Sequence, residues 1–119
     1  MDNKEFSKEL EIRTRRFAIQ IIKLSASIPY SIESKVIKNQ ITKSGTSIGA
    51  NYREANRARS KADFSSRIGI CESESSETVY WIELLEELDW IPLINIEPVL
   101  KEANELLAIF STIGKTLKQ

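Results

Sequence analysis

Apolar residues recur every three or four positions through most of the chain, in four separate segments. This spacing gathers them on one face of an α-helix, since a helix turns once every 3.6 residues. We expect helices at about residues 3–28, 32–56, 60–90 and 96–117. No segment alternates apolar and polar residues as a half-buried strand would. The pattern therefore predicts an all-α protein.

The residues at the segment ends fit this prediction. Ser31 and Ser60 are expected N-caps, because a serine hydroxyl can accept a hydrogen bond from an unpaired backbone N–H of the first turn. Asp63 follows Ser60 by three residues, as in a capping box. Asn95 is the expected cap of the fourth helix, which would place Pro98 in the first turn, where proline is tolerated.

The four helices have matched lengths and short connections, which favour an antiparallel, up-down-up-down four-helix bundle. The chain has 119 residues, of which 41% are hydrophobic, and this is enough for one core. We therefore assign residues 1–119 to a single domain.

Several residues predict how the helices pack. The apolar stripe of the first helix begins at Phe6, and either Arg13 or Thr14 fills its one gap; Phe64 and Cys71 lie on the stripe of the third helix. A second apolar set on the first helix suggests another contact, such as a second subunit: Ile12, Ile19, Ile22 and Ala26.

Gly45 and Gly49 lie inside the second helix, where each costs about 1 kcal/mol relative to alanine. A close approach to a neighbouring helix would explain them, and a local helix distortion is the alternative.

Charge is divided unevenly along a chain whose net charge is zero. Residues 1–67 contain 14 Lys+Arg and 7 Asp+Glu (net +7), whereas residues 68–119 contain 3 and 10 (net −7). Such asymmetry can mark a nucleic-acid surface. It can also mark two faces that neutralise each other, within one chain or between subunits.

The densest basic cluster spans the connection between the second and third helices, and it comprises Arg53, Arg57, Arg59, Lys61 and Arg67. These side chains could bind the phosphates of RNA or DNA, with an affinity that falls steeply as salt rises. Alternatively, they pair with the Glu-rich third helix, within the chain or across an interface.

Catalytic chemistry is poorly represented. The chain has no histidine and a single cysteine, which excludes Ser-His and Cys-His nucleophile pairs and a cysteine-based metal site. Glu74 and Glu77 are adjacent on a helix, and we interpret them as part of a solvated or ion-paired face. We therefore predict no enzyme activity, no cofactor and no small-molecule substrate. The chain also lacks a signal sequence and an apolar run that would span a membrane, so we expect a cytoplasmic protein.

Several blocks of sequence resemble a known family. They are TSIGANYREA at residues 46–55, SKADF at 60–64, GICE at 69–72 and ETVYWIELL at 77–85. The blocks are similar to those of small bacterial four-helix-bundle proteins first noticed in intervening sequences of large-subunit ribosomal RNA genes. The resemblance extends over nearly the whole chain.

The resemblance implies a left-handed antiparallel bundle that assembles into a ring, typically a homopentamer, with no established enzymatic activity. A related branch, the accessory variability protein of diversity-generating retroelements, binds nucleic acid and is strongly basic, whereas this chain is neutral. The motif positions of unassigned role are Asn51, Glu54, Glu74, Glu77 and Trp81. The resemblance assigns these positions no role; from the residues themselves we expect Arg53 and Glu77 to bridge helices and Trp81 to pack against its neighbours.

Overall fold

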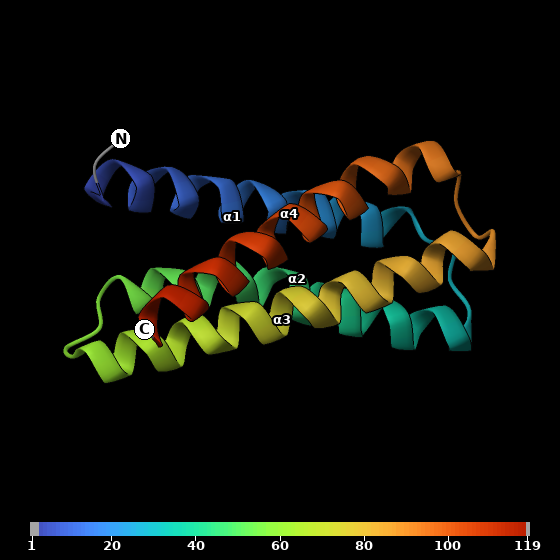
Figure 1. Cartoon of the computed structure of the whole chain (residues 1–119). Coiled ribbons are helices and arrows are strands. Elements are labelled where there is room, and N and C mark those ends of the chain that lie inside the picture. Colours follow the sequence, from blue (N-terminus) through green and yellow to red (C-terminus); the bar gives the residue numbers. More distant parts are fainter. Residues whose placement is uncertain (1–2, 119) are drawn as a thin grey trace.

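The computed structural model describes residues 3–118, which form four helices joined by short connections (Figure 1). The helices are α1 (Asn3–Ser27), α2 (Ile32–Ala55), α3 (Lys61–Leu88) and α4 (Leu93–Leu117). Each packs against the next one in the chain, and α4 returns to α1. The predicted all-α four-helix bundle is confirmed. It measures 44 × 26 × 21 Å along its principal axes.

Serine hydroxyls cap the N-termini of α2 and α3, as the sequence predicts. The Ser31 Oγ accepts a hydrogen bond from the backbone N–H of Ser34 at 2.9 Å, and the Ser34 Oγ accepts one from the Ser31 N–H at 2.7 Å. The Ser60 Oγ accepts from the Asp63 N–H at 3.0 Å. These bonds satisfy N–H groups that have no partner within the helix.

The start of α4 differs from the prediction. The helix begins at Leu93, so Asn95 is not its cap, and Pro98 is inside the helix and not in the first turn. Pro92 occupies the cap position in an extended conformation (φ −63°, ψ 138°), and no side chain caps this helix. The preceding helix also ends early, because Asp89 adopts a left-handed conformation with φ of 58°. Sequence periodicity did not indicate this early turn.

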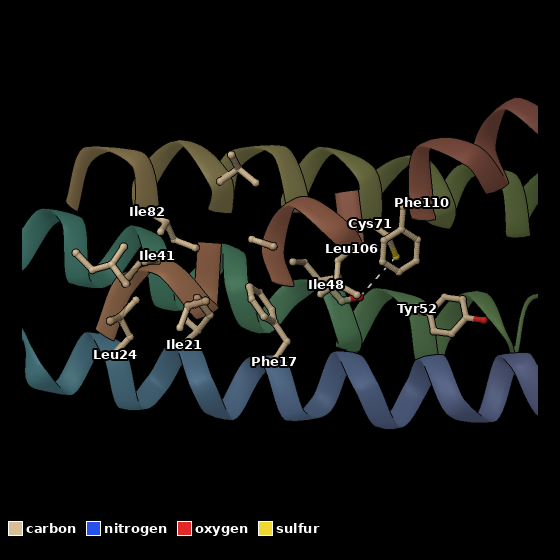
Figure 2. Close-up of a cluster of buried hydrophobic side chains, with 14 of the residues drawn as sticks. Phe17, Ile21, Leu24, Ile41, Ile48, Tyr52, Cys71, Ile82, Leu106 and Phe110 are labelled. Atoms are coloured by element: carbon tan, nitrogen blue, oxygen red, sulfur yellow. Dashed lines mark hydrogen bonds between the residues drawn. The ribbon is translucent and has the colours of Figure 1, made fainter. Parts of the chain in front are cut away.

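The core is a continuous layer of side chains between all four helices (Figure 2). Phe17, Ile21, Ile48 and Phe110 are fully buried in it. Cys71 is also fully buried, with its Sγ 3.6 Å from the Ile48 carbonyl oxygen, so it is a core residue as expected.

The exposed fractions of three side chains test the predicted apolar stripes of α1 and α3. Thr14, and not Arg13, fills the gap in the α1 stripe: it is fully buried and its hydroxyl donates to the Leu10 carbonyl at 2.9 Å. Phe6 was expected in the core but is 40% exposed, because α4 diverges from the N-terminal part of α1 (Figure 1). Phe64 packs against the core but is only half-buried, since it lies in the first turn of α3 at the end of the bundle.

The two glycines of α2 mark a close approach to α1, as the first of the two explanations predicts. A Cβ added at Gly45 would lie 2.8 Å from two side-chain carbons of Ile21. A Cβ at Gly49 would lie 3.1 Å from the Thr14 hydroxyl and 3.3 Å from its backbone carbonyl carbon. Over residues 3–118, no helix carries an apolar stretch long enough to cross a membrane.

Candidate functional site

A basic groove lies between the outer faces of α1 and α2. Its volume is about 510 Å³, and its charged lining consists of Lys8, Arg15, Arg53, Arg57 and a single acid, Glu11. The Glu11 carboxylate accepts a hydrogen bond from the Asn56 side-chain amide at 2.9 Å. The groove therefore presents four cations around a floor of small residues, which include Gly49 and Ala50. This arrangement suits an anionic partner.

The structure brings together only part of the predicted basic cluster. Arg53 and Arg57 join Lys8 and Arg15 of α1 in the groove, and these two α1 residues were missed because they are distant in sequence. Arg59 and Lys61 are exposed at the α2–α3 connection.

Arg67 is one turn into α3, where its guanidinium lies 3.9 Å from the Asp63 carboxylate. Within residues 3–118, none of the other four cluster residues has a carboxylate within ion-pair distance. Of the five cluster residues, only Arg67 therefore shows the intrachain pairing with the third helix among residues 3–118, through Asp63.

The family-motif residues lie on α2 and α3. The Asn51 amide donates to the Ser47 carbonyl at 2.9 Å, and Glu54 is exposed. Trp81 is half-buried and packs against the core, as expected, and its indole N–H donates to the Glu77 carboxylate at 3.3 Å. Arg53 and Glu77 were expected to bridge helices, but neither has an ion-pair partner among residues 3–118. Arg53 projects from the side of α2 that faces α1, away from α3.

Glu74 is the motif residue whose charge is least well accommodated. Burial raises the pKa of its carboxyl, the nearby Glu77 raises this pKa further, and Lys43 acts in the opposite direction. Both effects penalise the ionised form of Glu74. A cation approaching this part of α3 would relieve the repulsion.

Three large apolar side chains are exposed along the outside of α3, among serine and glutamate residues. Ile70, Tyr80 and Leu88 are 40%, 54% and 39% exposed, and Trp81 packs edge-on against Tyr80 with ring centroids 5.1 Å apart. The opposite face of the same helix supplies core residues such as Ile68 and Ile82. Exposed large apolar side chains that lie along one side of a helix can mark a surface that a partner covers. Sequence reasoning found only the inner stripe.

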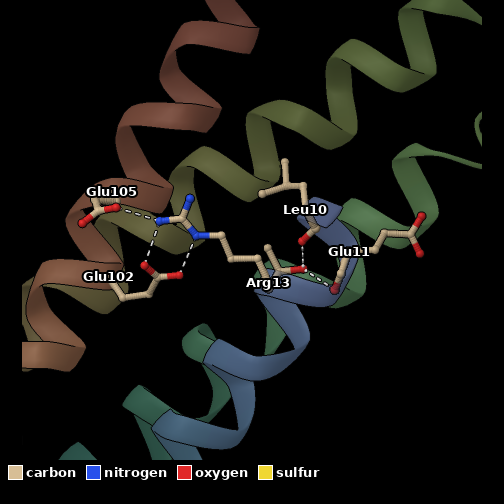
Figure 3. A network of polar contacts seen from close by, with 6 residues as sticks. Leu10, Glu11, Arg13, Glu102 and Glu105 are labelled. Carbon is tan, nitrogen blue, oxygen red and sulfur yellow. Dashed lines mark hydrogen bonds and ion pairs between the residues drawn. The ribbon is translucent and has the colours of Figure 1, made fainter. Parts of the chain in front are cut away.

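One polar cluster joins α1 and α4 at the surface (Figure 3). The Arg13 guanidinium donates two hydrogen bonds to Glu102, at 2.7 and 2.8 Å, and one to Glu105 at 2.8 Å. The bonds to Glu102 raise the pKa of Arg13 further above its ordinary value, so its charge is permanent. Beside this cluster, a groove of about 810 Å³ opens between the two helices and exposes Phe6.

Reactive groups are scarce in the described part of the chain. Burial raises the pKa of the Cys71 thiol to about 12, so the thiolate that would act as a nucleophile does not form near neutral pH. No cluster of three His, Cys, Asp or Glu side chains in residues 3–118 is placed to hold a metal ion.

Comparison with known proteins identifies the family. Residues 8–112 match the family described as 23S rRNA-intervening sequence protein. The chain belongs to this family. The predicted family resemblance is thus confirmed, and the match to the 23S rRNA-intervening sequence protein family includes α2 and α3 and most of α1 and α4.

A solved structure agrees with this assignment. It is a protein of unknown function from the S23 ribosomal protein family of Bacteroides thetaiotaomicron VPI-5482. It shares 35% sequence identity with this chain, and the alignment covers 88% of this chain and 97% of that one, with a TM-score of 0.81. A comparison with curated proteins gives no match.

Proposed function

We propose that this 23S rRNA-intervening sequence protein is a non-catalytic assembly module that forms a homo-oligomeric ring, a pentamer by family resemblance. The observation that carries the proposal is the presence of two exposed apolar faces on two different helices. Ile19 and Ile22 of α1 are 48% and 49% exposed, and Ile70 and Tyr80 of α3 are 40% and 54% exposed.

The positions of these two faces favour a ring. Each of α1 and α3 packs against α2 and α4, whereas α1 and α3 do not pack against each other over residues 3–118. Their outer faces therefore lie on diagonally opposite edges of the bundle. When two different patches meet, the contact is heterologous, and its repetition closes into a ring if the rotation allows.

Light scattering on the purified protein, at low and high salt, tests the proposal. Five copies of the 13.6 kDa chain give about 68 kDa, which is the expected mass. The ratio of absorbance at 260 and 280 nm of the same sample reports any nucleic acid that purifies with it. A mass near that of one chain at both salt concentrations would overturn the proposal.

A second candidate function is binding to RNA or DNA, and the basic groove between α1 and α2 specifically favours it. Lys8, Arg15, Arg53 and Arg57 converge there from two helices, and the one acid in the lining is engaged with Asn56. Cations arranged along a groove can follow a phosphate backbone, and they bind it with a strong salt dependence.

A labelled single-stranded RNA, titrated at several salt concentrations, tests this second function. Arg53→Glu combined with Arg57→Glu should weaken binding at least tenfold and flatten the salt dependence. The matched control is Lys101→Glu, which reverses an exposed charge on α4. Equal binding by the variant and the control, or no binding at low salt, would rule the groove out as a nucleic-acid site.

A further inference from the structure

We infer that the two exposed apolar faces are the two halves of one interface, in which α1 of one copy docks on α3 of the next. The α1 ridge consists of Ile12, Ile19 and Ile22 with the flanking cations Arg15, Arg16 and Lys23. The α3 stripe consists of Ile70, Tyr80 and Leu88 with the flanking acids Glu77, Glu83 and Glu87. This inference rests on the proposed function, because it names the surfaces through which the ring would form.

The α1 ridge has the shape of a docking surface. Ile12 and Ile19 are two helical turns apart and Ile22 is one turn further, so the three side chains follow one line of about 15 Å along the outside of the helix. Ile12 is half-buried, and the other two are about half exposed. Within residues 3–118, the flanking Arg15, Arg16 and Lys23 are exposed and have no carboxylate within ion-pair distance.

The α3 stripe has the composition of a docking surface. Tyr80 is its centre, held edge-on against Trp81. Ile70 and Leu88 lie about 15 and 12 Å from it along the helix, with Ser73, Ser76 and Glu77 between Ile70 and Tyr80. Tyrosine and tryptophan are the residues most often found at the energetic centre of an interface. The flanking Glu77, Glu83 and Glu87 are exposed, and each lacks a basic partner among residues 3–118.

Charge identifies the occupant of each surface as a second copy of this chain. The ridge lies in the half of the sequence with net charge +7, and the stripe lies in the half with net charge −7. A ridge against a ridge, or a stripe against a stripe, would place like charges opposite each other, which is strongly disfavoured. A ridge against a stripe pairs opposite charges and covers both apolar faces. The pairing is therefore head-to-tail, as a cyclic assembly requires.

Charge reversal tests the pairing. We expect that Arg15→Glu with Lys23→Glu lowers the mass in solution from the ring value to that of one chain, and that Glu77→Lys with Glu87→Lys does the same. All four changes in one chain restore complementarity, so this combined variant should regain the ring mass. The matched control is Lys101→Glu with Glu97→Lys, which changes exposed charges of α4 and should leave the mass unchanged. Circular dichroism confirms that each variant is helical.

The outcomes separate this inference from the proposed function. A wild-type protein that is monomeric overturns the assembly function itself. A wild-type ring that survives both double variants, or a combined variant that fails to recover, overturns the ridge-to-stripe pairing and leaves assembly through other faces.

Cross-linking gives a second test that does not depend on the charge variants. Ile19→Cys and Tyr80→Cys chains, unfolded together and refolded, should be joined by a short bismaleimide. Ile19→Cys alone should not be joined, and neither should Ile19→Cys mixed with Asn104→Cys of α4. Efficient cross-linking in either of these controls, or none in the mixture, contradicts the pairing.

Discussion

Replacing Gly45 with alanine tests the packing of α1 against α2, because the added methyl group has no space. Its carbon would lie 2.8 Å from two side-chain carbons of Ile21, and Ile21 is itself fully buried and cannot turn away. Gly69 of α3 provides a matched control, since nothing lies within 4 Å of a Cβ added there. Both positions are inside helices, so both substitutions gain the same intrinsic preference of alanine for the helix.

The magnitude follows from these two opposing terms. Gly69→Ala should stabilise the fold by about 1 kcal/mol, since it gains helix propensity at no packing cost. Gly45→Ala gains the same amount but overfills the core, which typically costs about 1–3 kcal/mol. The difference between the two variants in the free energy of unfolding should therefore be about 1–3 kcal/mol, with Gly45→Ala the less stable.

Urea unfolding followed by circular dichroism measures this difference, provided that all samples have the same protomer concentration. Light scattering should show that both variants keep the wild-type mass, so that assembly does not contribute to the difference. If Gly45→Ala were as stable as Gly69→Ala, α1 and α2 would not approach as closely as described.

Four further predictions concern individual side chains. The pKa of Glu74 is higher in the folded protein than in the unfolded chain, so ionisation of Glu74 lowers the free energy of unfolding. This loss of stability is absent at a pH below the unfolded-state pKa and complete at a pH above the folded-state pKa. Glu74→Gln should therefore stabilise the protein at pH 7 in urea unfolding, with a gain that disappears as the pH falls to 4; a gain that grows on acidification would refute this sign. Arg13→Met should cost about 1–2 kcal/mol, because its two bonds to Glu102 are charge-assisted but partly exposed to solvent; a double-mutant cycle with Glu102→Gln measures the coupling, and a coupling of zero would show that the pair contributes nothing. Cys71 should react with a maleimide only after unfolding, and rapid labelling of the native protein would contradict its burial. Phe64→Ala should cost about 2 kcal/mol, roughly half the value for a fully buried phenylalanine, and a loss above about 4 kcal/mol would show that Phe64 is a core residue after all.

Periodicity and capping chemistry predicted the fold well because both depend on local sequence. Ser31 and Ser60 cap their helices through bonds to residues three positions away, which a linear reading detects. The start of α4 was misjudged because Pro92, which has no side chain that can cap a helix, precedes its first residue. The end of α3 was placed too late because Asp89 adopts a left-handed conformation. Such a conformation in a residue other than glycine is hard to foresee from sequence.

The arrangement of charges was predicted less well, since it depends on which helices become neighbours. Arg53 was expected to reach α3, but it projects toward α1 and joins Lys8 and Arg15 there. No pattern in the local sequence indicates that these three residues lie close together in the fold. The exposed Ile70, Tyr80 and Leu88 of α3 were not found, because their spacings of ten and eight residues do not repeat every three or four positions.

Native mass spectrometry of the wild-type protein tests the central claim, assembly into a closed ring, most directly. A closed ring gives one dominant species with a fixed whole number of copies, about 68 kDa for five chains of 13.6 kDa. That species should persist on dilution. A species of one chain only, or a series of masses that grows with concentration as in an open filament, would contradict the account.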